Sequence, residues 1–287
     1  MKVLLLGPGG QLGWELGRTC PQGITLHSYG YPDVDLANEE SLRDCINAVQ
    51  PDRIVNAAAY TAVDKAEAEP ELAWQINSRA VAVLAGLCRE HHIRLAQIST
   101  DFVFSGENSR PYLPEDPPQP LGVYGQSKRG GEKAILEILG KDGLIIRTAW
   151  LYSSHRNNFV KTMLRLMAEK EHISVVDDQV GTPTWARGLA KAVWAALEKD
   201  LRGIFHWTDA GVASWYDFAM AVQEEGLALG LLAEEIPVTP VGTKEYPTPA
   251  RRPGYSVLDT RSLVEQTGLL PVHWRKQLRL MLQELAV

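Results

Sequence analysis

Tyr124 and Lys128 are the two side chains of this chain whose types and spacing suit acid–base chemistry. They stand four residues apart, after a proline-rich loop and at the mouth of a helical pattern that runs from Lys128 to Leu139. On a helix, residues i and i+4 share one face, with Cβ atoms about 5–6 Å apart. A phenol has an ordinary pKa of about 10, so we expect the neighbouring ammonium to lower it and to make Tyr124 a usable proton donor. Exposed helices also produce such pairs by chance, so the surrounding elements must show whether this pair is catalytic.

A glycine-rich turn follows the first strand-like run. Val3–Leu6 is continuously apolar, as in a strand buried on both faces of a parallel sheet. It leads into three glycines spaced Gly-x-x-Gly-x-x-Gly and then into a helical pattern. Glycine permits the tight turn and the close approach of backbone amides to a pyrophosphate, while the helix N-terminus offers its dipole to the phosphates. The sequence therefore predicts a dinucleotide site at Gly7, Gly10, Gln11, Leu12 and Gly13.

Further cofactor candidates follow the second and third strands. Ile24–Ser28 is predicted as the second strand, and neither a carboxylate nor an arginine stands at its tip, so NADH and NADPH both remain open, with NADPH slightly favoured. Asp35 and Leu36 could border the adenine, although a turn or cap role for Asp35 is an equal alternative. The third strand, 53–59, ends in small side chains that leave room for a flat cofactor. Residues at this end complete the predicted cofactor site: Ala58, Ala59, Tyr60 and Thr61.

Strands and helices alternate through the first half of the chain. Helical patterns cover 39–49 and 71–91, where Leu72 is expected on the apolar face, and further strands are predicted at 94–98 and 144–147. This order predicts an α/β fold with a Rossmann-type, doubly wound parallel sheet.

The second half alternates less regularly. We expect residues 1–152 to form a dinucleotide-binding domain to which 184–206 return, and 153–183 with 207–287 to form mainly a smaller, interleaved C-terminal substrate-binding domain. Thr184 is predicted to be the N-cap of the helix that follows it.

Composition excludes several classes of function. The chain is 45% hydrophobic and 22% charged, and its net charge of -6 argues against binding nucleic acid through a basic face. No apolar run approaches the roughly 18 residues of a membrane span. The three cysteines and seven histidines lack metal-site spacing. We therefore predict a cytoplasmic protein with no nucleic acid partner, no membrane segment and no catalytic metal.

Several strings together carry a family resemblance. The glycine turn at Gly7, the segment Asn56–Ala59, the pair Ser99–Thr100 and Tyr124-x-x-x-Lys128 resemble the extended short-chain dehydrogenase/reductases. The strings that narrow this further are 55–67, 99–104, 147–152, 157–164 and 246–253. They are similar to dTDP-4-dehydrorhamnose reductases, and the likeness runs the full chain. The resemblance implies NAD(P)H-dependent reduction of the C4 carbonyl of a nucleotide sugar, dTDP-4-dehydro-β-L-rhamnose, to dTDP-L-rhamnose.

The resemblance also implies roles for three catalytic residues. Tyr124 would donate the proton to the C4 oxygen, Lys128 would hold the nicotinamide ribose and keep the tyrosine acidic, and Thr100 would hydrogen-bond the same oxygen. Carbonyl reduction needs such an acid, an electrostatic helper and a hydroxyl donor at the developing charge.

Substrate contacts implied by the resemblance lie at three places. Asp101 would bind a sugar hydroxyl, and Trp150 would place its ring near the sugar or base. Arg251 or Arg252 could pair with the substrate diphosphate, although two arginines on a solvated loop are an equal alternative.

Two other functions remain open at this stage. One is a different nucleotide-sugar reductase or epimerase of the same fold. The other is a non-catalytic, NADP-binding regulatory subunit similar to that of methionine adenosyltransferase, which could keep Tyr124 and Lys128. Nucleotide-sugar dehydratases are disfavoured, because they carry an Asp-Glu pair where this chain has Asp101 followed by Phe102.

Some members of the family resemble homodimers bridged by Mg²⁺. Glutamates on the first helix (here Glu15), on the helix after Pro183, and near the C-terminus would hold that ion. Arg187 stands where the second glutamate is expected. This departure argues against the metal-bridged dimer.

Overall fold

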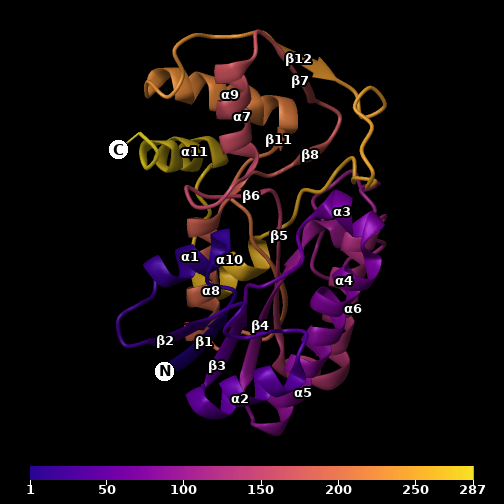
Figure 1. Ribbon diagram of the computed structural model, residues 1–287, viewed down its shortest axis with the longest axis vertical. Coiled ribbons are helices and arrows are strands. Elements are labelled where there is room, and N and C mark those ends of the chain that lie inside the picture. Colours follow the sequence, from indigo (N-terminus) through magenta and orange to yellow (C-terminus); the bar gives the residue numbers. More distant parts are fainter. Residues whose placement is uncertain (287) are drawn as a thin grey trace.

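A six-stranded parallel sheet forms the centre of the protein (Figure 1) in the computed structural model, which describes residues 1–286. The strand order is β10-β5-β4-β3-β1-β2, and every neighbouring pair is parallel. The strands are β1 (Lys2–Leu6), β2 (Thr25–Tyr29), β3 (Arg53–Asn56), β4 (Arg94–Thr100), β5 (Leu144–Thr148) and β10 (Gly203–His206). The predicted doubly wound α/β fold is confirmed.

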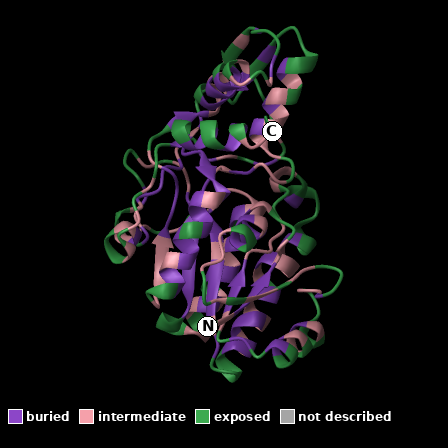
Figure 2. Cartoon of the chain, turned by 90° about the vertical axis from the view of Figure 1, so that its left-hand side faces the viewer, coloured by how far each residue is buried: buried purple, intermediate pink, exposed green. Residues whose placement is uncertain are grey.

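Helices cover both faces of this sheet. Successive side chains of a strand point to opposite faces, and β1 shows the consequence. Val3 and Leu5 belong to the hydrophobic cluster that includes α1 (Gln11–Arg18), α8 (Ala186–Glu198) and α10 (Arg261–Thr267). Leu4 and Leu6 belong to the cluster that includes α2 (Glu39–Val49), α5 (Ala80–Glu90) and α6 (Val123–Ile138). Figure 2 shows the buried strands between partly exposed helices.

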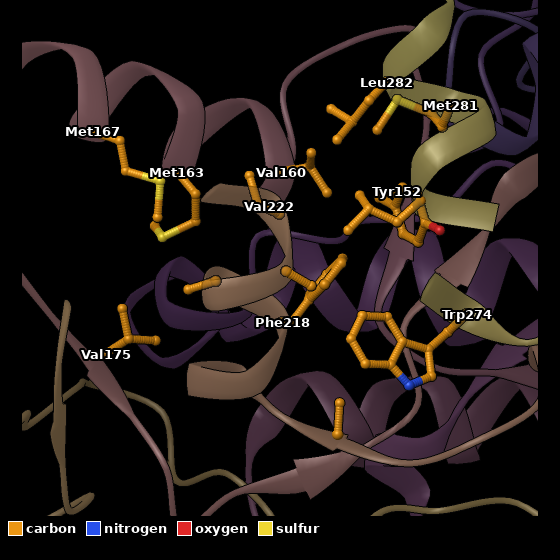
Figure 3. Close-up of a cluster of buried hydrophobic side chains, with 14 of the residues drawn as sticks. Tyr152, Val160, Met163, Met167, Val175, Phe218, Val222, Trp274, Met281 and Leu282 are labelled. Atoms are coloured by element: carbon orange, nitrogen blue, oxygen red, sulfur yellow. The ribbon is translucent and has the colours of Figure 1, made fainter. Parts of the chain in front are cut away.

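A separate hydrophobic cluster lies beyond the carboxyl ends of the strands, in the upper part of Figure 1. It joins α7 (Phe159–Glu169), α9 (Trp215–Ala228) and α11 (Trp274–Gln283). Figure 3 shows Tyr152, Phe218 and Trp274 close together within it, and none of the three is more than 4% exposed. Three two-stranded sheets surround this cluster: β7 (Ile173–Val176) with β12 (Val238–Val241), β8 (Val180–Gly181) with β11 (Ala213–Ser214), and β6 (Leu151–Tyr152) with β9 (Thr184–Trp185).

The strand order creates a crevice at one edge of the sheet. After β1 the chain crosses to β2 on one side, and it then returns to β3 on the other side of β1. The loops that follow β1 and β3 therefore diverge from neighbouring strand ends. Open α/β sheets bind their ligands at such a switch point.

Some predicted boundaries are wrong. The third strand ends at Asn56, so the alanines that follow lie in a loop. The helix predicted at 71–91 is divided into α4 (Pro70–Trp74), a π-helical turn at Gln75–Arg79 and α5. Leu72 is 46% exposed rather than part of the apolar face. A further short helix, α3 (Val63–Ala68), precedes them.

The predicted N-cap role of Thr184 is also wrong. Thr184 lies in β9, and its hydroxyl donates to the carbonyl of Thr182 at 3.1 Å. Trp185 precedes α8 instead, without a capping side chain. The tertiary pairing of β6 with β9 has overridden the local capping preference of threonine.

Among residues 1–286, no helix has both the length and the apolar character that crossing a bilayer requires.

Candidate active site

The glycine turn has the close backbone packing that its sequence predicts. Gly7 has a φ of 85°, in the left-handed region, and a Cβ built there would lie 2.7 Å from the amide nitrogen of Ala58. A Cβ built at Gly13 would lie 2.1 Å from the carbonyl oxygen of Gly7. Real Cβ atoms do not approach backbone this closely, so both positions require glycine. Gly10 is the residue before α1, whose N-terminus faces the turn.

The first residues of α1 can offer backbone amides to an anion. The Leu12 side chain is buried in the hydrophobic cluster between the sheet and α8, so only the backbone amide of Leu12 is available to a ligand. The Gln11 side chain accepts a hydrogen bond of 3.0 Å from Nδ2 of Asn158, a residue of the loop after β6. These contacts fix the start of α1 in place.

The loop after β3 lies directly against the glycine turn through Ala58. Asn77 holds this loop, because its side chain accepts from the Tyr60 amide at 2.9 Å and donates to the Tyr60 carbonyl at 3.0 Å. The same amide nitrogen donates to Ser127, whose hydroxyl donates to the backbone carbonyl of Tyr124. Asn77 thus ties the predicted cofactor loop to α6. In the sequence, Asn77 stands out as an amide inside an apolar helical stretch, where a buried amide must find hydrogen-bond partners.

Other predicted cofactor residues lie around the same edge. Ala59 is half-buried and Thr61 is exposed. The Asp35 carboxylate accepts from the Ala37 amide at 2.9 Å, which is the turn role that we considered as the alternative. Leu36 packs against the cluster on the α2 side of the sheet.

Tyr124, Thr100 and Asp101 meet where β4 ends. Tyr124 is on the first turn of α6, which begins at Val123 rather than at Lys128. Its ring packs edge-on against Phe102, with ring centroids 5.5 Å apart. Burial raises the pKa of Tyr124 to about 12, the Asp101 carboxylate adds to the rise, and a hydrogen bond with Thr100 opposes it. The expectation that Lys128 lowers this pKa is wrong for this structure, because burial dominates.

Asp101 is a buried carboxyl with an unused oxygen. Its Oδ1 accepts a hydrogen bond of 3.0 Å from the Thr100 hydroxyl, while Oδ2 has no partner among residues 1–286. Burial raises its pKa to about 6, and the nearby hydroxyls of Ser256 and Thr100 limit the rise. A buried acceptor without a partner costs free energy, so this oxygen is available to a ligand hydroxyl.

Lys128 lies one turn further along α6 and points back to the sheet. Its Nζ donates to the carbonyl of Ile98 at 2.7 Å, and the side chain is almost fully buried. Burial lowers the pKa of Lys128 to about 8, although Glu132 opposes the shift. The ammonium is still the main form at neutral pH.

A buried ion pair fixes α6 against β4 and β5. Arg147 donates to both oxygens of Glu132 at 2.8 Å, and neither side chain is more than 1% exposed. Ser99 donates to the same carboxylate at 2.6 Å. The Ser99 hydroxyl is therefore committed to this ion pair, and Thr100 is the residue of the Ser-Thr pair that reaches Tyr124.

The predicted substrate residues come from three loops. Trp150 has a φ of 46° and stacks on Trp215, with ring centroids 3.6 Å apart. Arg252 forms an ion pair with Asp64 at 2.8 Å. Arg251 is exposed and has no ion-pair partner among residues 1–286. Of the two arginines, Arg251 is the one free to meet an anion.

Two carboxylates of α3 position these elements, and our sequence reasoning missed both. Asp64 holds the 248–252 loop through Arg252 and the Ala250 amide. Glu67 accepts from the Val123 amide at 2.9 Å and so caps the N-terminus of α6. Their partners lie far away in the sequence, so no local pattern reveals these roles.

Comparisons with known proteins agree with this geometry. The family model described as "RmlD substrate binding domain" matches residues 1–287. The dTDP-4-dehydrorhamnose reductase of Escherichia coli (strain K12) is 42% identical over 295 residues, covering 99% of this chain and 98% of the relative.

The chain belongs to the RmlD substrate-binding-domain family.

Similar solved structures also include dTDP-4-dehydrorhamnose reductases. A dTDP-4-dehydrorhamnose reductase from Clostridium acetobutylicum superposes with a TM-score of 0.94 at 36% identity, covering 100% of both chains. The dTDP-4-dehydrorhamnose reductase of Bacillus anthracis, solved in complex with NADP, has a TM-score of 0.92 at 33% identity and covers 99% of both chains.

The glycine turn of this RmlD-family chain fits a dinucleotide. Without a Cβ at Gly7 and Gly13, the turn, the loop after β3 and α1 pack closely together, and the first backbone amides of α1 follow the turn directly. The chemistry of the donors suits a pyrophosphate.

The residues near Glu15 do not fit a bridging Mg²⁺. Nε of Arg187 lies 3.0 Å from the Glu15 carboxylate, and the same guanidinium pairs with Glu284. Arg18 and Ser154 add further hydrogen bonds to Glu284. A guanidinium therefore occupies the position between the two carboxylates. No group of three potential metal ligands was found among residues 1–286.

Proposed function

We propose that this chain reduces the C4 carbonyl of dTDP-4-dehydro-β-L-rhamnose to give dTDP-L-rhamnose, with NADPH or NADH as the reductant. The observation that carries the proposal is the position of Tyr124, which lies beside Thr100 at the end of β4, on the edge of the sheet where the glycine turn follows β1. The 42% identity with a reductase of that name, over nearly the whole chain, supports the choice of substrate.

The residues of α6 and β4 divide the acid–base work. The nicotinamide cofactor, when bound, supplies the hydride that C4 receives. Tyr124 donates its proton to the C4 oxygen, and its raised pKa keeps the phenol protonated at neutral pH, as a proton donor must be. Thr100 donates a hydrogen bond to the same oxygen once its hydroxyl, which donates to Asp101 Oδ1 in the free protein, turns toward the substrate. Lys128, whose ammonium is the main form at neutral pH, would hold the nicotinamide ribose from one turn further along α6.

The substrate is held from the loops beyond the sheet. Asp101 accepts a hydrogen bond from a sugar hydroxyl through its unpartnered Oδ2. Trp150, stacked on Trp215, borders the sugar or base. Arg251 pairs with the diphosphate, because its guanidinium carries no ion pair in the described chain while Arg252 is held by Asp64.

A turnover assay tests this function directly. Purified protein is mixed with NADPH and enzymatically made dTDP-4-dehydro-L-rhamnose, and the absorbance of the reduced nicotinamide is followed. We expect Tyr124→Phe to bind the cofactor as the parent does and to lose about 10²–10⁴-fold in turnover, the usual contribution of a positioned acid. Tyr216→Phe, which alters a half-buried tyrosine of α9, is the control and should keep the parent rate.

Two outcomes would overturn the proposal. Turnover of Tyr124→Phe at the parent rate would remove Tyr124 as the proton donor. Absence of oxidation with the parent protein, while NADPH still binds, would favour the non-catalytic NADP-binding subunit instead.

A further inference from the structure

Arg156 is a cation without a counter-ion. Almost every arginine of residues 1–286 lies within ion-pair distance of a carboxylate, and the exceptions are Arg89, Arg156 and Arg251. Arg251 has its place in the proposed function. Arg89 lies at the end of α5, before β4 begins, and therefore at the opposite edge of the sheet from the crevice. Arg156 has no assigned role.

The side chain of Arg156 lies on the glycine turn. Its Nε donates to the carbonyl of Gly9 at 2.8 Å. A Cβ built at Gly9 would lie 3.2 Å from Nη2 of the same guanidinium. Arginine has five N–H donors, and this side chain is exposed. Most of its donors are therefore open to a ligand at the turn.

The loop that carries Arg156 is held in position on both sides. His155 stacks on Trp14 of α1, with ring centroids 4.9 Å apart and an interplanar angle of 11°. Asn158 caps α7 and also donates to Gln11. Arg156 itself has a φ of 63°, a left-handed conformation that non-glycine residues rarely adopt. Such strain persists only where the surroundings enforce it, and it often marks a ligand contact.

The tip of β2 lies beside the same part of the turn. The Gly7 amide donates to the carbonyl of Tyr29, the last residue of β2, at 2.9 Å. A Cβ built at the next residue, Gly30, would lie 3.2 Å from the ring of Pro8. In dinucleotide folds the end of the second strand holds the adenosine ribose. The ribose 2′ position is therefore expected next to Pro8 and Gly9, where Arg156 lies.

We propose that Arg156 binds the 2′-phosphate of NADPH and so sets the cofactor preference of this chain. The tip of β2 offers no arginine of its own, and Arg156, which comes from the loop after β6, supplies the missing cation across the turn. A guanidinium matches the several oxygens of a phosphate better than a single carbonyl does. This inference rests on the proposed use of a nicotinamide cofactor, but not on the identity of the sugar.

Cofactor binding to the full-length chain tests the inference without any sugar substrate. Dissociation constants for NADPH and for NADH are measured by the quenching of tryptophan fluorescence in the parent and in Arg156→Gln. We expect the variant to bind NADPH at least about tenfold more weakly, since a charge-assisted contact to phosphate is lost, and to bind NADH as the parent does. Arg156→Lys should recover part of the loss, and Arg89→Gln, the control, should match the parent for both cofactors.

Three outcomes would overturn the inference. Unchanged NADPH affinity in Arg156→Gln would leave the side chain as a tie between two loops. An equal loss for NADPH and NADH would move the contact to the diphosphate that both cofactors share. A parent protein that binds NADH more tightly than NADPH would also refute it. The turnover assay reports separately on the proposed function, which stands if NADH supports reduction and Arg156→Gln binds both cofactors normally.

Discussion

Replacing Lys128 by methionine should stabilise the protein while it abolishes turnover. The Lys128 ammonium is buried with a single strong hydrogen bond, to the Ile98 carbonyl, and burial lowers its pKa from 10.5 to about 8. The folded state therefore pays to keep this group charged at neutral pH. Methionine has a similar length and carries no charge to desolvate.

The size and the pH dependence of the effect follow from linkage. Each pKa unit corresponds to about 1.4 kcal/mol, so the shift from 10.5 to about 8 costs the folded state about 3 kcal/mol below pH 8. Loss of the hydrogen bond to the Ile98 carbonyl costs the variant about 1 kcal/mol. Lys128→Met should therefore be more stable than the parent by about 2 kcal/mol near pH 7. Between pH 8 and pH 10.5 the unfolded chain binds more protons than the folded one, so the parent gains stability as pH rises. By about pH 9.5 the advantage of the variant should fall by about 2 kcal/mol.

Urea unfolding of the parent and the variant, near pH 7 and near pH 9.5, measures this difference. Lys133→Met changes an exposed lysine of the same helix and should show no comparable gain at either pH. The reasoning would be refuted if Lys128→Met were less stable than the parent by the same amount at both values. Turnover should be lost in Lys128→Met alone, because only Lys128 lies beside the reacting groups.

Two further predictions concern the parts that position the site. Gly13→Ala would place a methyl group 2.1 Å from the Gly7 carbonyl and should abolish NADPH binding. Gly17→Ala, whose methyl group meets nothing within 4 Å, is the control; it should change the free energy of unfolding little or raise it by about 0.5–1 kcal/mol. Equal NADPH binding by both variants in a fluorescence titration would contradict this prediction. Arg147→Met leaves the buried Glu132 carboxylate without its main partner and should lower the free energy of unfolding by about 3–5 kcal/mol in urea, so a loss below about 1 kcal/mol would count against the buried pair.

Several elements of the first half were predictable because their signals are local. The apolar run before Gly7, the glycine spacing and the helix at 39–49 each occupy adjacent residues, and the structure contains them near the predicted bounds. The second half was harder, because strands such as β6, β8 and β9 have two residues each and carry no period that a pattern could reveal. Thr184 is an example: its sequence predicts a helix N-cap, but in the structure it lies in β9 and pairs with β6.

The residue types and spacing by themselves determined the chemistry that this chain could perform: a phenol and an amine four residues apart, a glycine turn after a buried strand, and a threonine at a strand end. The tertiary structure alone decided how those groups are tuned and which neighbours are free. Burial sets the pKa values of Tyr124 and Lys128. An ion pair with Asp64 holds the guanidinium of Arg252, whereas that of Arg251 can still bind an anionic ligand. Solvation and charge pairing depend on atoms that are distant in sequence and close in space, so no local pattern contains them.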